Sequence, residues 1–228
     1  MAKVDEMKQQ EAAIGEAVSK TESFLENHSK AIVWSIVALF VVVGAVFGYR
    51  KLVVEPRAEK ASELMVEAQY RFEQANPDYV LALNGDENGA GFLEVIEQYG
   101  STPAGNLAKH YAGICYLKLG DLASAAEYLA KFSPVKGLPG EVVNAQNLGL
   151  QGDVAVENGD YEGAIALYKK AVAASDNELT APLFLYKQIV AYVALGNKEE
   201  AQKCLDTLTT KYPTAAEVRF AEELLGTL

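Results

Sequence analysis

The stretch GDVAVENGDYEGAIALYKKA, residues 152–171, contains the pattern on which the fold of this chain depends. Gly159 and Asp160 stand between two segments whose apolar residues recur at helical spacing, so we expect a helix on either side of the pair. Glycine ends a helix readily in the left-handed conformation, and an aspartate after it accepts bonds from the free N–H groups of the next helix. A small residue, Gly152, lets the two helices approach closely around Tyr168. The stretch therefore predicts an antiparallel pair of helices.

The same pattern occurs three times between residues 113 and 213. Its Gly-Asp or Gly-Asn pairs begin at Gly120, Gly159 and Gly196, which are 39 and 37 residues apart. The tetratricopeptide repeat, a helix–turn–helix unit of about 34 residues, has this pattern. The residues beyond 34 in each repeat lie in longer connectors such as residues 134–140. The small residues of the pattern are Gly113, Ala125, Gly152, Ala164 and Ala201, and the large ones are Tyr116, Leu129, Tyr168 and Leu205. We therefore predict an all-α fold, a solenoid of antiparallel tetratricopeptide helix pairs.

Further helices are expected on both sides of the repeats. Helical spacing predicts a long helix at residues 58–74, a shorter one at 92–98 and a terminal helix at 215–225. The terminal helix would cover the last apolar face, as solenoids require. The chain then has four segments: a polar cytoplasmic segment at 1–30, an anchor at 31–49, a linker with the first solenoid helices at 50–103, and the repeats with their capping helix at 104–228. The polar segment could form a surface helix or be disordered, and its composition leaves this open.

Residues 31–49, AIVWSIVALFVVVGAVFGY, form a run of 19 residues without a charge. As a helix with a rise of about 1.5 Å per residue, the run spans roughly the hydrocarbon core of a bilayer. Trp34 and Tyr49 lie near its ends, where amphipathic rings prefer the membrane interface. A cleaved signal peptide has a shorter charged region before the apolar run and a small-x-small site after it, and both are missing here. We therefore expect an uncleaved, single-pass transmembrane helix.

The charges beside this anchor bear on its orientation. Within about 15 residues, the basic side chains are Lys20 and Lys30 before the anchor, and Arg50, Lys51, Arg57 and Lys60 after it. Counted alone, they place the C-terminal side in the cytoplasm. The excess is small, and long domains are translocated despite flanking charge, so this count leaves the orientation open.

The composition excludes several function classes. The chain has a net charge of −11, and residues 52–228 contain 25 acidic against 14 basic side chains, which argues against nucleic-acid binding. Catalytic and phosphate-binding motifs are not recognisable, so we expect neither an enzyme nor a cofactor. Cys115 and Cys204 lie in apolar helical stretches and are expected to be separate buried thiols. His28 and His110 have no cysteine partners at ligand spacing, so a metal site is not expected.

Residues 84–89, NGDENG, resemble the start of an EF-hand calcium loop. Such a loop needs a glutamate at its twelfth position, where this chain has Val95. We therefore expect a connection between helices rather than a calcium site.

The first helices of the three pairs are expected to line a concave groove. With Gly113 and Gly152 as position eight of a repeat and Gly196 as position fifteen, the groove positions are two, five, nine, twelve and thirteen. They are occupied by Leu107, His110, Ile114, Leu117 and Lys118, then by Gln146, Gly149, Asp153, Val156 and Glu157, and finally by Leu183, Tyr186, Val190, Val193 and Ala194.

These side chains predict an apolar groove with an acidic middle and without the clamp of Lys, Arg and Asn that binds a C-terminal carboxylate. Such a groove suits an extended or helical apolar segment of another protein. Alternatively, the terminal helix or the helix at 58–74 fills the groove itself. The sequence leaves both possibilities open.

The layout of the whole chain resembles the YfgM-like tetratricopeptide family of bacterial envelope proteins. The resemblance lies in FLENHSKA at 24–31, in GYRK at 48–51, and in GNLAKHYAG at 105–113 followed by Tyr116 and Gly120-Asp121. It implies a protein of the bacterial inner membrane, with a cytoplasmic N-terminus and the repeats in the periplasm. It also implies association with the SecYEG translocon and with a PpiD-like periplasmic chaperone.

Two function classes follow from these expectations. In the first, the chain is a protein-interaction module that assists the Sec translocon and periplasmic chaperones in protein export, with nascent secretory chains as possible partners. In the second, it is a structural scaffold subunit of another envelope complex.

Overall fold

The computed structural model describes residues 2–227, together with the side chains of these residues except 2–14, 16–18, 23 and 25. It divides into two compact units, Met1–Pro56 and Arg57–Leu228. The helices are α1 (Ala2–Tyr49), η1 (Arg50–Val54), α2 (Glu55–Phe72), α3 (Tyr79–Asn84), α4 (Phe92–Tyr99), α5 (Pro103–Leu119), α6 (Leu122–Lys131), α7 (Leu138–Glu157), α8 (Tyr161–Ala174), α9 (Ala181–Ala194), α10 (Lys198–Lys211) and α11 (Ala216–Gly226).

The described residues of the first unit are all helical, and α1 contains the predicted anchor. This helix is long and apolar enough to cross a membrane, judged by its length and composition, and its apolar window is not buried against other parts of the described chain. The polar segment before the anchor, whose state the composition left open, is also helical.

A π-helical turn, η1, follows the anchor, and Pro56 explains it. The N–H of Glu55 donates to the carbonyl of Arg50, five residues earlier, instead of four. Proline has no N–H to continue an α-helix, and its ring crowds the carbonyl four residues before it. A wider turn relieves this conflict.

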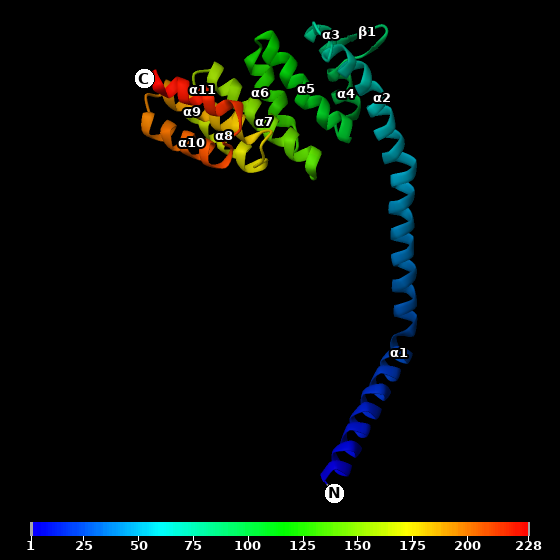
Figure 1. Cartoon of the computed structure of the whole chain (residues 1–228). Coiled ribbons are helices and arrows are strands. Elements are labelled where there is room, and N and C mark those ends of the chain that lie inside the picture. Colours follow the sequence, from blue (N-terminus) through cyan, green and yellow to red (C-terminus); the bar gives the residue numbers. More distant parts are fainter. Residues whose placement is uncertain (1, 228) are drawn as a thin grey trace. The chain divides into compact units, whose positions relative to one another are not determined.

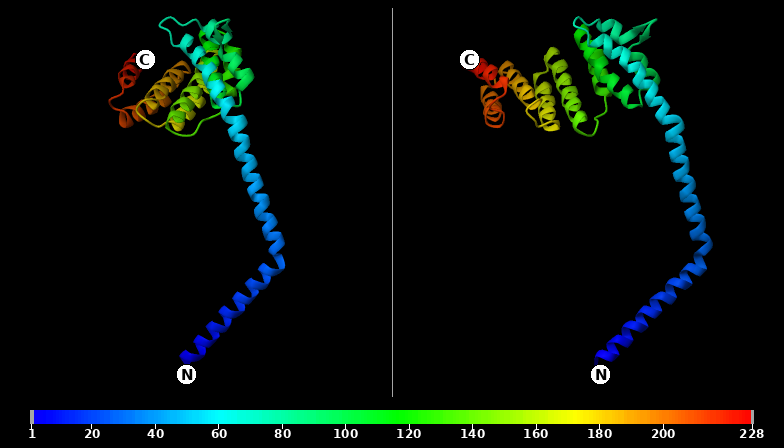
Figure 2. Two further views of the ribbon diagram at one scale, coloured as in Figure 1. Left: turned by 90° about the vertical axis from the view of Figure 1, so that its right-hand side faces the viewer. Right: turned by 45° about the vertical axis from the view of Figure 1, so that its right-hand side comes forward.

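The second unit is the predicted solenoid. Helices α5 and α6, α7 and α8, and α9 and α10 form three antiparallel pairs that follow one another along the chain (Figure 1). Figure 2 shows the same succession of pairs from two further sides. The all-α expectation and the three repeats are confirmed.

The turns inside the pairs have the predicted geometry. Gly120, Gly159 and Gly196 have φ angles of 80°, 78° and 71°, in the left-handed region that glycine adopts without steric cost. In each pair, the next residue then caps the second helix. Asp121, Asp160 and Asn197 accept bonds from the backbone N–H groups of Ser124, Gly163 and Glu200, respectively.

Close packing within the first two pairs depends on the predicted small residues. A Cβ added at Gly113 would lie 2.5 Å from Cγ of Leu129, and one added at Gly152 would lie 2.5 Å from Cε1 of Tyr168. Each glycine therefore leaves the space that a large side chain of the second helix fills.

Additional helices close both ends of the solenoid. At the N-terminal end, Met65 of α2 and Phe92 of α4 join the buried cluster around Ala112 of α5. At the C-terminal end, Ala221 of α11 is buried in the cluster that α9 and α10 form. Both ends are thus covered by apolar contacts, as a solenoid requires.

The segment that resembles a calcium loop forms a small hairpin between α3 and α4. Strands β1 (Gly85–Asp86) and β2 (Gly89–Ala90) pair antiparallel. Asp86 binds the guanidinium of Arg71 at 2.6 Å and accepts a bond from the N–H of Asn88. The carboxylate at the third position of the loop, that of Asp86, is therefore part of an ion pair.

Both cysteines are free, as predicted. Cys115 is fully buried, and burial raises its pKa to about 12. Cys204 of α10 is half-buried rather than buried; it packs against the cluster of the last pair, with its sulfur 3.9 Å from Oε1 of Gln188 in α9.

We predict that Gly152→Ala lowers the free energy of unfolding by about 1–3 kcal/mol, because its Cβ overpacks the contact with Tyr168. Near-UV circular dichroism of the tyrosines during denaturant unfolding measures the change. The matched control is Gly226→Ala, whose Cβ meets no atom within 4 Å and which should change stability by at most about 1 kcal/mol. Equal stability of the two variants would contradict the packing role of Gly152.

Candidate partner-binding groove

The surface along α7 is hollowed by two adjoining cavities. One has a volume of about 500 Å³ and the other about 290 Å³, and Asp153 lines both. We refer to them as the large cavity and the small cavity. Together they follow α7 from Gln146 to Glu157.

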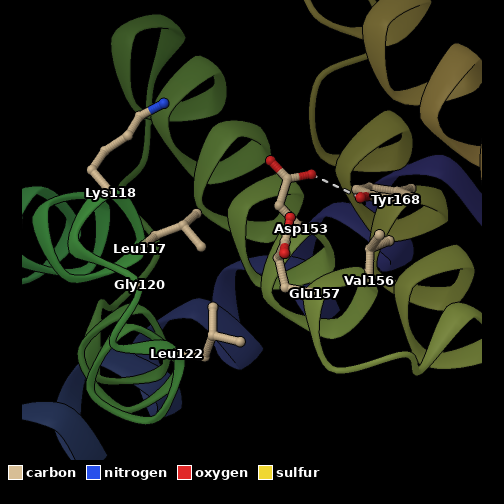
Figure 3. A pocket seen from close by; sticks show the side chains of 8 residues that line it. All are labelled: Leu117, Lys118, Gly120, Leu122, Asp153, Val156, Glu157 and Tyr168. Carbon is tan, nitrogen blue, oxygen red and sulfur yellow. Dashed lines mark hydrogen bonds between the residues drawn. The ribbon is translucent and has the colours of Figure 1, made fainter.

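The large cavity lies between the first and second helix pairs. Its lining residues are Leu117, Lys118, Gly120, Leu122, Asp153, Val156, Glu157 and Tyr168. Figure 3 shows Leu117 and Leu122 on one side of the space, and Val156 and Glu157 on the other. Among the described residues, no ion pair involves Lys118 or Glu157. Both charges are therefore available to a ligand.

The small cavity lies between the first helices of all three pairs, α5, α7 and α9. Its lining residues are His110, Ile114, Gln146, Gly149, Leu150, Asp153, Leu183, Phe184 and Lys187. The ring of Phe184 occupies the space beside Gly149, where a Cβ would lie 2.0 Å from its Cε1 atom. The missing side chain at Gly149 therefore allows α9 to insert an aromatic ring toward α7.

An ion pair joins α7 to α9 at the boundary between the cavities. Lys187 binds Asp153 at 2.6 Å. The hydroxyl of Tyr168 in α8 donates to the same carboxylate at 2.7 Å, a bond that Figure 3 shows. The side chains of Asp153 and Lys187 are 27% and 29% exposed, so the pair is partly shielded from water. The expected acidic middle of the groove is thus neutralised at Asp153, and the prediction missed its cation.

His110 lies at the base of the small cavity and is only 4% exposed. The amide nitrogen of Asn147 lies 3.2 Å from its Nδ1 atom, and Gln151 in turn donates to the Asn147 oxygen. Burial lowers the pKa of His110 to about 4. The ring is therefore neutral at physiological pH and contributes shape rather than charge.

The predicted groove residues divide into two groups. Those that line the cavities are His110, Ile114, Leu117, Lys118, Gln146, Gly149, Asp153, Val156, Glu157 and Leu183. The others lie elsewhere: Leu107 packs against the N-terminal cluster, Tyr186 and Val193 pack in the C-terminal cluster, and Val190 and Ala194 are exposed. Tyr186 contacts Phe220 of α11, with ring centroids 6.3 Å apart. Of the five groove positions of the third repeat, two therefore pack in the C-terminal cluster, two are exposed, and only Leu183 lines a cavity.

The terminal helix and α2 do not contribute to the lining that the described residues provide. α11 lies beside α9 and α10, in the place that the first helix of a fourth repeat would take. The hollow along α7 is therefore open, and the possibility that the chain's own helices fill it does not apply to these two cavities.

The missed lining residues of the small cavity, Leu150, Phe184 and Lys187, stand at positions three and six of their repeats, whereas those of the large cavity, Gly120, Leu122 and Tyr168, lie in a turn or in second helices. Position five of one first helix contacts position three of the next, as in His110 with Asn147 and Gly149 with Phe184. Position nine meets position six in the same way, as in Asp153 with Lys187. Listing positions three and six together with the groove positions would have found Phe184 and Lys187.

Residues 155–222 match a family model described as tetratricopeptide repeat. The matched region runs from the end of α7 into α11, and it includes the second and third Gly-Asp or Gly-Asn turns. No curated protein matched the sequence. The match and the fold together indicate tetratricopeptide repeats, a fold that mediates protein–protein interaction.

We predict that His110 makes stability depend on pH. Its folded-state pKa, about 4, lies below the unfolded value of 6.5, so the unfolded state binds the extra proton. Stability is full above pH 6.5 and falls as pH drops toward 4, by an amount on the order of 3 kcal/mol. The free energy of unfolding should differ less between pH 7 and pH 4.5 for His110→Gln than for the wild type. If this difference is the same in both proteins, the His110 ring is not buried in its neutral form.

Proposed function

We propose that this chain is a membrane-anchored protein-interaction module whose groove along α7 binds a segment of another protein. The observation that carries the proposal is the open hollow itself. Groove positions of the first two repeats, read from the repeat register alone, surround two adjoining cavities that α2 and α11 leave free. The small cavity combines apolar walls with a few polar groups, and the large cavity adds Lys118 and Glu157; such a combination is typical of surfaces that bind peptide segments.

The proposed partners come from the resemblance to the YfgM-like family. We infer that the chain is an ancillary factor of the SecYEG translocon and of a PpiD-like chaperone, with nascent secretory chains as further partners. The helix α1 supports this proposal because it gives the repeats a membrane attachment. A role as a structural scaffold of another envelope complex is the alternative, and the partners recovered with the protein distinguish the two.

The proposed orientation places the N-terminus in the cytoplasm and the repeats in the periplasm of the inner membrane. Protease added to spheroplasts should then degrade the repeats, because they are exposed outside the membrane. The loss of an epitope placed after Gly226 reports on this, with a cytoplasmic protein as the control for intact membranes. Repeats that survive until the membrane is lysed would contradict the proposed orientation.

We predict that the double variant Leu117→Glu and Leu183→Glu loses its protein partners, because each carboxylate enters an apolar part of the hollow. Co-purification from membranes in mild detergent measures the loss, with SecYEG and the chaperone among the proteins identified. The matched control is Leu119→Glu with Leu195→Glu. Both leucines are 45% exposed on α5 and beside α9, and neither lines a cavity. Near-UV circular dichroism establishes that both variants are folded.

Retention of the same partners by the folded groove variant would contradict binding in the groove. Recovery of a fixed assembly without translocon subunits would contradict the export role and favour the scaffold role.

A further inference from the structure

We propose that the small cavity is a specificity pocket that admits one bulky, uncharged apolar side chain of the bound segment and rejects charged groups. The inference rests on the proposed function, since it names the chemistry of the segment that the groove binds. Three features of the small cavity support the proposal: apolar walls, ionisable groups that are already paired, and a small volume.

The walls provide apolar surface on three helices. Ile114 of α5, Leu150 of α7, and Leu183 and Phe184 of α9 face the cavity. Leu183 is 39% exposed at the rim, whereas Phe184 is 3% exposed and lies deep. A side chain that enters therefore exchanges water for apolar contacts on several sides, which is the main source of affinity in such a pocket.

The ionisable groups beside these walls are already paired, and Gln146, the remaining polar lining residue, is exposed and uncharged. Asp153 is neutralised by Lys187 at 2.6 Å, and it also accepts the bond from Tyr168. His110 is neutral, with its Nδ1 atom beside the amide of Asn147. A charged side chain in this cavity would lose water without gaining a free counter-ion, and burial of an unpaired charge is strongly unfavourable. A C-terminal carboxylate is rejected for the same reason.

The dimensions favour an extended segment. A volume of about 290 Å³ lies at the lower limit for cavities that hold small ligands, so it accommodates one large side chain and not a helix. From Gln146 to Glu157, α7 extends about 17 Å at 1.5 Å per residue, a length that roughly five extended residues cover.

The large cavity determines what surrounds the apolar residue. It adjoins the small cavity at Asp153 and presents Lys118 and Glu157 without ion-pair partners among the described residues. Because one charge of each sign is available there, polar or charged residues of the segment are accepted beside the apolar one. The proposed ligand is therefore an extended stretch of about five residues with Leu, Ile, Met or Phe at one position and polar residues toward the large cavity.

The test uses the full chain in lipid nanodiscs and a phage-displayed library of random 12-residue peptides, with empty nanodiscs as the background. Peptides enriched on the wild type should share one bulky apolar position. Replacing that residue by Ala, Lys or Glu should weaken binding of the synthetic peptide at least about tenfold. Enriched peptides without such a position, or peptides that bind through their C-terminal carboxylate, would overturn the proposal. An absence of enrichment over empty nanodiscs would overturn it as well.

A variant that fills the cavity tests its location. Leu183→Trp places a bulky indole ring at the rim and should weaken binding of the selected peptide at least about tenfold. Leu195→Trp, at the end of the same helix and outside the cavity, is the matched control and should bind as the wild type does. Equal binding by both variants would place the apolar position elsewhere.

A second variant tests why charge is rejected. Lys187→Met leaves the Asp153 carboxylate without its counter-ion, so the selected peptide with Lys at the apolar position should bind this variant better than it binds the wild type. Unchanged discrimination against Lys would overturn the role assigned to the ion pair. If all of these results are negative but the groove variants still lose their partners on co-purification, the pocket is wrong and the proposed function stands. If co-purification is also unaffected, both are wrong.

Discussion

In the first two helix pairs, the contact between a glycine of one helix and a large side chain of its partner is the constraint on which the groove depends. Gly152 leaves room for Tyr168, and this contact brings α8 close enough for the tyrosine hydroxyl to reach Asp153. Asp153 in turn holds Lys187 of α9. A packing contact within one helix pair thus positions the polar group that joins that pair to the next, at the centre of the groove.

Local features of this fold were predictable because neighbouring residues determine them. The left-handed glycine and the capping side chain after it, as at Gly159 and Asp160, involve atoms within a few residues of each other. The wide turn before Pro56 is local too, and the proline could have indicated it. The groove was predictable only in part. Its face on α5 and α7 follows from the repeat register, whereas the contribution of α9 depends on how successive pairs stack.

The same stacking explains the errors at the site. Asp153 was read as part of an acidic middle because the sequence places its cation 34 residues away, on the next pair. Tyr186 and Val193 were assigned to the groove by their register, but α11 lies against that face. An ion pair between Asp153 and Lys187 now stands in the middle of the groove, and the expected partner remains an apolar segment, with an extended rather than a helical conformation.

Photo-crosslinking in intact membranes tests the central claim, partner binding in the groove along α7, most directly. A photoreactive residue replaces Leu183 at the rim of the small cavity or Lys170 on the exposed face of α8, in two otherwise identical chains. We predict protein adducts from position 183 and few or none from position 170. Adducts of equal yield from both positions, or adducts from position 170 alone, would contradict the claim that this groove is the binding surface.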